Sequence, residues 1–308
     1  MKKWISVLLA VFLACTACLA CAEEDTDALV DRGNEAFNAN DYATALELYI
    51  KAADAGNTRG ITNLGRLYQY GLGVEQSYEK AIEYYKRASE MGQSASTSSL
   101  AFLYYYGEGV EQDYQKALEL FALAADQGDA SAFGQLGHMY CNGEGVETDY
   151  GKALEYYMRG AELGNDTSVH NIGWMYENGL GMEPDYEKAF EYYTLGAEMG
   201  NMLSFYGLGL LYLEGKGTEQ SYEKTMEYWR RSAELGYPPA YEAVGELYRD
   251  GLGVEQDYEK AADWFHKAAE LGEPKEAQIN YDKLIEEGKI PADYIPKDIV
   301  FDHQQENE

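Results

Sequence analysis

Apolar residues recur along the chain with the spacing of an amphipathic helix. Leu64, Leu67 and Tyr68 stand at i, i+3 and i+4, so the pattern predicts a helix at about 59–70. Gly71 and Gly73 interrupt the pattern, as glycines in turns do. This first helix, which we call helix A, is therefore expected to end in a glycine-containing loop.

A second helix, helix B, is predicted directly after that loop. Ser77 is a favourable N-cap residue, and Gly92 stands where a left-handed residue would end the helix. The expected buried face consists of Ala81, Tyr84, Tyr85 and Ala88. Small residues such as Gly65 and Ala81 would let the two helices approach closely, with the tyrosine rings filling the gaps beside them.

The two-helix pattern repeats every 36 residues. The same position of helix A is occupied by Tyr68, Tyr104, Tyr140, Tyr176, Tyr212 and Tyr248. The loop glycines keep this spacing, as do the glycines that follow helix B. Because one helix pair cannot bury its own apolar face, the units must stack, and we predict an all-α solenoid.

The repeating unit G-x-x-Y-x-x-G-x-G-V-x-x-D-Y-x-K-A-x-x-Y-Y-x-x-A-A-x-x-G resembles the Sel-one-like repeat (SLR) family. This family is a relative of the tetratricopeptide repeat with a longer turn between its helices. Six units spanning 58–272 follow the pattern. The resemblance implies an α/α solenoid, a right-handed superhelix of stacked helix pairs, that serves protein–protein interaction.

The segments on either side of the six units differ from them. Residues 23–57 resemble an ordinary tetratricopeptide unit, because Gly33 and Ala45 are 12 positions apart whereas Gly65 and Ala81 are 16 apart. Residues 273–287 are expected to form a capping helix. Residues 288–308, interrupted by prolines, are expected to form an extended tail.

The N-terminal segment 1–22 has the pattern of a secretory signal peptide. Lys2 and Lys3 precede a short apolar run, and the small residues Ala20 and Ala22 suit a cleavage site after Ala22. We therefore expect export to the periplasm, the cell envelope or the cell exterior. The alternative is a lipoprotein leader, in which Cys15, Cys18 or Cys21 accepts the lipid that tethers the N-terminus.

Composition narrows the classes of partner. The chain has 308 residues with a net charge of −30, which opposes binding to nucleic-acid phosphate. Hydrophobic residues make up 46% of the chain, enough apolar surface for a folded core. The sequence outside the leader contains no second apolar span, so we expect no transmembrane helix.

Candidate binding residues come from the variable positions of helix A. In the resembled families helix A lines the concave groove, and its outward positions contact the ligand. These positions are Arg66, Tyr70, Phe102, Tyr105, Tyr106, His138, Asn142, His170, Trp174, Asn178, Tyr206 and Leu210. Aromatic rings supply buried area and amides bind a peptide backbone, so we predict a protein or peptide ligand. The acids Glu242, Glu246 and Asp250 of the last unit would suit a basic stretch of that ligand.

The sequence motifs that would indicate catalysis or metal binding are weaker than those that indicate an interaction scaffold. Ser77-x-x-Lys80 and Ser221-x-x-Lys224 match the S-x-x-K nucleophile motif, and some cysteine-rich SLR proteins are credited with penicillin binding or hydrolysis. No S-D-N or K-T-G follows, and the chain lacks paired cysteines in its repeats, so we interpret both serines as N-caps and expect no enzyme. His138, Cys141 and His170 do not form a convincing metal site, and no cofactor is implied.

The sequence thus predicts a non-catalytic, exported interaction scaffold. The alternatives are a β-lactamase-like or penicillin-binding enzyme and a binder of peptidoglycan or glycan fragments, in which tyrosine and tryptophan rings would stack on sugars.

Overall fold

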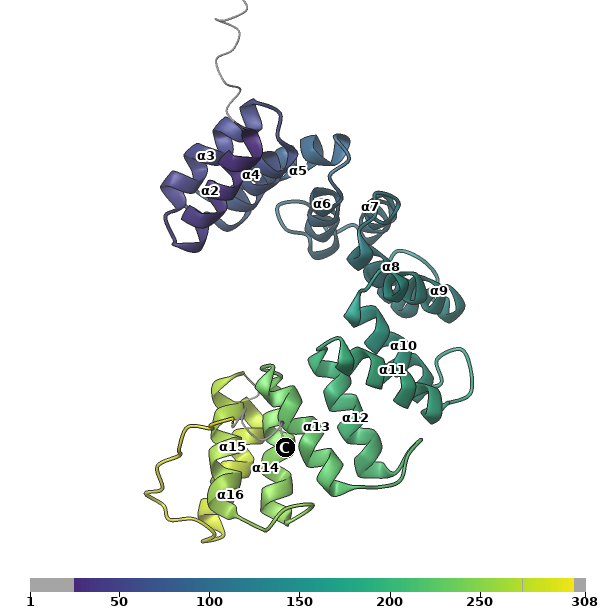
Figure 1. Ribbon diagram of the computed structural model, residues 1–308, viewed down its shortest axis with the longest axis vertical. Coiled ribbons are helices and arrows are strands. Elements are labelled where there is room, and N and C mark those ends of the chain that lie inside the picture. Colours follow the sequence, from purple (N-terminus) through teal and green to yellow (C-terminus); the bar gives the residue numbers. More distant parts are fainter. Residues whose placement is uncertain (1–24, 273, 302–308) are drawn as a thin grey trace, which may run out of the picture. The chain divides into compact units, whose positions relative to one another are not determined.

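The computed structural model describes residues 25–272 and 274–301, and these residues form helices and loops without strands (Figure 1). The predicted leader, residues 1–22, lies outside the described residues. Each helix in this described part of the chain has 13 residues: α2 (Thr26–Asn38), α3 (Tyr42–Asp54), α4 (Thr58–Tyr70), α5 (Tyr78–Glu90), α6 (Ser94–Tyr106), α7 (Tyr114–Asp126), α8 (Ala130–Asn142), α9 (Tyr150–Glu162), α10 (Asp166–Asn178), α11 (Tyr186–Glu198), α12 (Met202–Glu214), α13 (Tyr222–Glu234), α14 (Pro238–Asp250), α15 (Tyr258–Glu270) and α16 (Pro274–Glu286). The predicted all-α fold of paired helices is confirmed.

Local sequence signals set the helix ends. Helix α4 ends at Gly71, whose backbone is left-handed with φ 67°. The side chain of Ser77 then caps α5 by accepting a hydrogen bond from the Lys80 N–H at 3.3 Å. Gly92 follows α5 with φ 84°, as its predicted role in helix termination requires. The same caps recur in the later pairs, with aspartate replacing serine in four of them.

Helix pairs pack through a ring on helix B and a small residue on helix A. A Cβ atom on Gly65 would lie 2.6 Å from Tyr85 Cε1, so only glycine fits the present ring position. Ala81, Tyr85 and Ala88 are buried as predicted, whereas Tyr84 is half-buried and stacks on Tyr68 with ring centroids 5.7 Å apart. The core is thus built from columns of identical or similar residues.

Successive pairs interlock through the long loop. Gly73, with φ 70°, lies against the first residue of the preceding helix B, because a Cβ atom there would be 2.8 Å from Tyr42 Cβ. The later loops repeat this contact, for example Gly181 on Tyr150 and Gly253 on Tyr222. The regular 36-residue spacing of these glycines therefore maintains contact between neighbouring repeats.

The chain divides into two compact units. The first contains the residues up to Ala132 together with Glu144–Val146, and the second contains Phe133–Gly143 together with the residues from Glu147 onward. In the first unit, α2 to α5 enclose a core that includes Leu29, Tyr49 and Leu64. In the second, one core joins α8 to α12 and another joins α13 to α16.

The C-terminal tail folds back onto the last repeat. From Lys289 to Phe301 the tail is non-helical, and Ile290 is buried. The Tyr294 hydroxyl donates to Asp263 at 2.8 Å, and the Lys297 N–H donates to the same carboxylate at 2.8 Å. Phe301 then packs edge-on against Trp264, with ring centroids 5.8 Å apart. The described part of the tail is therefore anchored to α15.

Candidate functional site

Helices α10 and α12 of the second unit border a cavity of about 400 Å³, which we call the aromatic cavity. It is lined by His170, Trp174, Glu177, Asn178, Tyr193, Leu203, Tyr206, Gly207, Leu210 and Tyr237. Five of these are predicted binding residues: His170, Trp174, Asn178, Tyr206 and Leu210. The spacings on α10 and α12 are those of one helix face, so the two faces meet at the cavity.

Tyr193 of α11 forms the base of the aromatic cavity. Its ring lies between two glycines, since Cβ atoms on Gly173 or Gly207 would each lie 2.7 Å from it. Its hydroxyl donates a hydrogen bond of 2.5 Å to Glu177. Burial, reinforced by the Glu177 charge, raises the pKa of Tyr193, so the phenol stays protonated.

His170 stacks on Tyr193, with ring centroids 5.2 Å apart. Its Nδ1 lies 3.4 Å from the Ser204 hydroxyl oxygen. Burial lowers the pKa of His170 to about 4, although the nearby Asp166 charge opposes the shift. The imidazole is therefore neutral at neutral pH and adds an uncharged ring to the cavity.

The rim of the cavity combines exposed and anchored rings. Trp174 is 39% exposed. Tyr206 stacks on Trp229 and contacts Tyr237 edge-on, with centroids 5.6 Å and 5.2 Å apart. Asn178 donates from its amide nitrogen to the Trp174 carbonyl at 2.9 Å, which leaves the Asn178 carbonyl oxygen for a ligand. The rim can thus bury apolar groups and accept a hydrogen bond.

A second cavity of about 380 Å³, the arginine cavity, lies in the first unit. It is lined by Asn34, Phe37, Asn38, Arg59, Thr62, Asn63, Arg66 and Gln93. Of the predicted binding residues it contains Arg66, whose guanidinium lies 4.3 Å from the centre of the Phe37 ring. Arg59 is paired with Asp31 at 2.8 Å.

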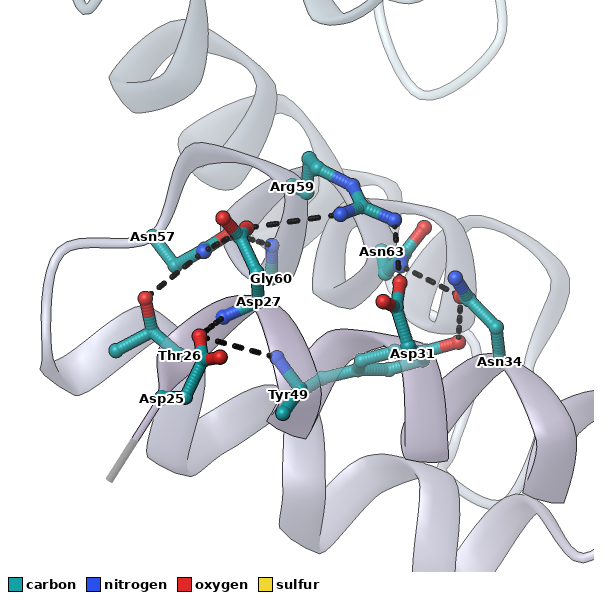
Figure 2. A network of polar contacts seen from close by, with 11 residues as sticks. Asp25, Thr26, Asp27, Asp31, Asn34, Tyr49, Asn57, Arg59, Gly60 and Asn63 are labelled. Atoms are coloured by element: carbon teal, nitrogen blue, oxygen red, sulfur yellow. Dashed lines mark hydrogen bonds and ion pairs between the residues drawn. The ribbon is translucent and has the colours of Figure 1, made fainter.

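A polar network links Asn34, Arg59 and Asn63, which line the arginine cavity, to neighbouring side chains (Figure 2). The Asn34 carbonyl oxygen accepts hydrogen bonds from the Tyr49 hydroxyl at 2.8 Å and from the Asn63 amide at 3.2 Å. These bonds fix the orientation of Asn34 and assign its NH₂ group as the remaining donor. Together with Arg66, this donor favours carbonyl or anionic groups.

The other predicted residues lie outside both cavities. Phe102 packs edge-on against the buried Phe121, with ring centroids 5.0 Å apart, and Tyr105 donates to Glu144 at 2.9 Å. Tyr70 and Tyr106 are exposed. His138 and Asn142 contact each other through Asn142 Nδ2 and His138 Nε2 at 2.9 Å. The structure therefore brings together five of the predicted residues and distributes the rest.

Several residues that line the two cavities are not among the predicted binding residues. Glu177 and Tyr237 belong to the aromatic cavity, and Asn34, Phe37 and Asn63 belong to the arginine cavity. Glu177 occupies a helix A position that varies between units, where Gln69 and Leu213 also occur. That variation was a usable signal, because the predicted groove residues were selected by the same criterion.

The S-x-x-K serines are helix caps. Ser77 and Ser221 accept hydrogen bonds from the backbone N–H groups of Lys80 and Lys224. The Lys224 ammonium pairs with Glu227 at 2.8 Å, and this hydrogen bond raises the pKa of Lys224. A lysine in that state is a poor general base.

Within residues 25–272 and 274–301, no group of three or more His, Cys, Asp or Glu side chains is placed to hold a metal ion. Cys141 is buried in that region, and burial raises the pKa of its thiol. Over the same residues, no helix is both long and apolar enough to cross a membrane.

The repeated helix pairs place the chain in the class of tetratricopeptide-like solenoids. Within that class the chain belongs to the Sel1 repeat family. The Sel1 repeat matches residues 39–57, 58–93, 95–129, 135–165, 168–201, 206–237 and 238–273. The Sel1 repeat family is a type of protein-interaction scaffold.

Two solved structures support the family and the fold. The chain is similar to a protective antigen of uropathogenic Escherichia coli that displays an SLR fold, with 32% identity over 86% of this chain and a TM-score of 0.68. The match spans 57% of that antigen. A Sel1 repeat protein from Oxalobacter formigenes is 31% identical over 78% of this chain and 99% of its own, with a TM-score of 0.73. No curated protein matches the chain.

Proposed function

We propose that the chain is an exported, non-catalytic adaptor that binds an extended segment of a partner protein at the aromatic cavity. The observation that carries this proposal is the convergence of His170, Trp174, Asn178, Tyr206 and Leu210 on one cavity. Trp174, Tyr206 and Leu210 offer apolar surface to side chains, and Asn178 offers hydrogen bonds to a peptide backbone. A volume of about 400 Å³ falls in the range of ligand sites.

A peptide-display experiment tests the binding site. A library of random dodecapeptides is selected on the purified full-length protein, and enriched peptides are titrated against variants. We expect Trp174→Ala with Asn178→Ala to weaken binding about tenfold or more, because both side chains are exposed at the rim. The matched control is Leu195→Ala, which removes an exposed apolar side chain from α11 of the same repeat.

The results of the display experiment distinguish a peptide site at the aromatic cavity from a site elsewhere and from glycan binding. Enriched peptides that bind the double variant of Trp174 and Asn178 as tightly as the Leu195→Ala control would place the interaction elsewhere on the scaffold. A library without enriched peptides would argue against a peptide site, and Trp174 fluorescence with soluble muropeptides would then test the glycan-binding alternative. Quenching by muropeptides at millimolar concentration would support that alternative.

Export is the second part of the proposal and rests on the composition of residues 1–22. Mass spectrometry of the protein recovered from its exporting host should give an N-terminus at Glu23. An N-terminal cysteine carrying a lipid would instead support the lipoprotein alternative. Recovery of an intact Met1 in the cytoplasm would contradict export.

A further inference from the structure

We propose that the aromatic cavity receives a lysine or arginine side chain of the bound segment, with Glu177 as the opposing charge and the rings of Trp174, Tyr206 and Tyr237 around the cation. This inference deepens the proposed peptide-binding function and rests on it. Three independent features of the cavity lead to it: the charges of its lining, the chemistry of Glu177 and the kind of surface around the carboxylate.

The lining carries one acidic side chain, Glu177, and no lysine or arginine. The arginine cavity has the opposite character, since Arg59 and Arg66 line it and no acid does. The chain as a whole has a net charge of −30, which attracts cationic segments over a distance. The two cavities are thus suited to different groups, and the aromatic cavity is suited to a cation.

The negative charge of Glu177 exceeds what the fold requires at that position. Glu177 accepts the hydroxyl hydrogen of Tyr193 at 2.5 Å, and in the first of the 36-residue units Gln69 accepts the corresponding hydrogen of Tyr85 at 2.8 Å. The two pairs occupy the same repeat positions, so a neutral amide satisfies the buried tyrosine equally well. The carboxylate of Glu177 therefore supplies a charge beyond this structural role.

The surroundings of Glu177 suit a long cationic side chain. Aromatic faces attract ammonium and guanidinium groups, and this attraction grows when water is displaced. Leu203 and Leu210 offer contact to the methylene groups that carry the charge. The chain uses the same pairing internally, because the Lys188 ammonium lies 4.8 Å from the centre of the Tyr176 ring on α10.

The pKa of Lys216, a cation of the described residues, responds to Glu177. That pKa is raised mainly by a hydrogen bond to Glu214, with Glu177 as a smaller cause. The Lys216 ammonium is paired with Glu214 and lies 5.2 Å from the centre of the Tyr186 ring. Its partners are therefore Glu214 and Tyr186, and the side chain does not line the cavity.

The test uses three short probes that differ in one side chain. Ac-Gly-Lys-Gly-NH₂, the norleucine analogue and the glutamate analogue are titrated into the full-length, ¹⁵N-labelled protein. The indole N–H signal of Trp174, identified with Trp174→Phe, reports binding. We expect the lysine probe to bind at least about fivefold more tightly than norleucine, and the glutamate probe to bind most weakly.

Glu177→Gln supplies the decisive variant. It retains the acceptor for Tyr193 and removes the charge, so the lysine probe should lose about fivefold in affinity while the norleucine probe is unchanged. The control Glu191→Gln removes the same charge from the exposed surface of α11 and should leave all affinities unchanged. An equal thermal midpoint for Glu177→Gln and the parent protein would show that the fold is preserved.

Each other outcome would overturn the cation assignment. Equal binding of the lysine and norleucine probes would leave the peptide site in place and remove its preference for a cation. Equal weakening by Glu177→Gln and Glu191→Gln would assign the preference to net charge rather than to the cavity. If no probe shifts the Trp174 signal, the cation pocket is rejected, and the display experiment decides the broader function independently.

Discussion

Gly137 of α8 and Tyr157 of α9 are in contact so close that a Cβ atom on Gly137 would lie 2.6 Å from Tyr157 Cδ1. Tyr157 is 2% exposed, so its ring has little room to withdraw. The same relationship joins Gly65 to Tyr85 and Gly173 to Tyr193. One close contact between a glycine and a ring thus recurs along the chain and determines how near the paired helices come.

Gly137→Val should therefore destabilise the protein by about 1–3 kcal/mol through overpacking. The matched control is Gly151→Ala in the first turn of α9, where an added Cβ would meet only Asp149 Oδ1 at 3.4 Å. This exposed position should gain up to about 1 kcal/mol, because alanine favours a helix over glycine. Urea unfolding of both variants measures the changes, and equal stabilities would contradict the packing argument.

Trp174→Ala should change the free energy of unfolding by less than about 1 kcal/mol, because Trp174 is 39% exposed at the cavity rim. Trp229→Ala in the next repeat is the contrasting variant. Trp229 is 4% exposed and its indole N–H donates to the Tyr206 carbonyl, so the loss should be about 3–5 kcal/mol. A large loss at Trp174 in thermal melts would place that side chain in the core.

Stability should fall in acid partly because of His170. Burial lowers its pKa to about 4, below the ordinary histidine value of about 6.5, so the unfolded chain binds the proton more tightly. Its contribution is fully present above pH 6.5 and is lost as the pH falls toward 4. The loss is on the order of 3 kcal/mol.

His170→Phe should flatten the dependence of unfolding free energy on pH between 6.5 and 4. Carboxylates titrate in part of this window, so the measured quantity is the difference between the parent and variant curves from urea unfolding. Parallel curves for the parent and His170→Phe would show that protonation of His170 has no such cost.

Ser77→Ala and Ser221→Ala should each cost about 1 kcal/mol of stability, because each removes an N-cap acceptor. Neither substitution should alter nitrocefin hydrolysis, which we expect to equal the uncatalysed rate in the parent protein. Hydrolysis by the parent that disappears in the double variant would instead support the penicillin-recognising alternative.

Asp263→Ala should release the C-terminal tail, because this carboxylate accepts hydrogen bonds from the Tyr294 hydroxyl and the Lys297 N–H. We expect faster proteolysis after residue 288 and a loss of about 1–3 kcal/mol. Glu227→Ala changes the corresponding position one repeat earlier, where the acid pairs with Lys224 on the surface. Its expected loss is below about 1 kcal/mol, and equal proteolysis of the two variants would contradict the anchoring role.

Features that depend on neighbouring residues in the chain could be predicted from the sequence. The helix expected at about 59–70 is α4 (Thr58–Tyr70), and the Ser77 cap and the Gly92 terminus lie at the predicted positions. These features follow from glycine conformations and side-chain caps within a few residues. The 36-residue period then extended the same prediction along the chain.

Features that depend on contacts between distant residues could not be predicted in the same way. Five of the predicted binding residues share one cavity because α10 and α12 meet there, whereas Phe102 turns toward Phe121 and Tyr105 toward Glu144. Helical spacing places a residue on a face but does not select its rotamer. Tyr294 of the tail contacts Asp263, which lies more than 30 positions earlier in the chain. No local sequence pattern predicts this contact.

The tail also takes up a contact that a loop glycine makes in the internal repeats. In the internal repeats of each unit, the first tyrosine of helix B receives a loop glycine from the next repeat, as Tyr222 receives Gly253. The residue 36 positions after Gly253 is Lys289. Its ammonium lies 4.9 Å from the centre of the ring of Tyr258, the first residue of α15. Lys289 thus occupies the place on Tyr258 where a further repeat would put its loop glycine.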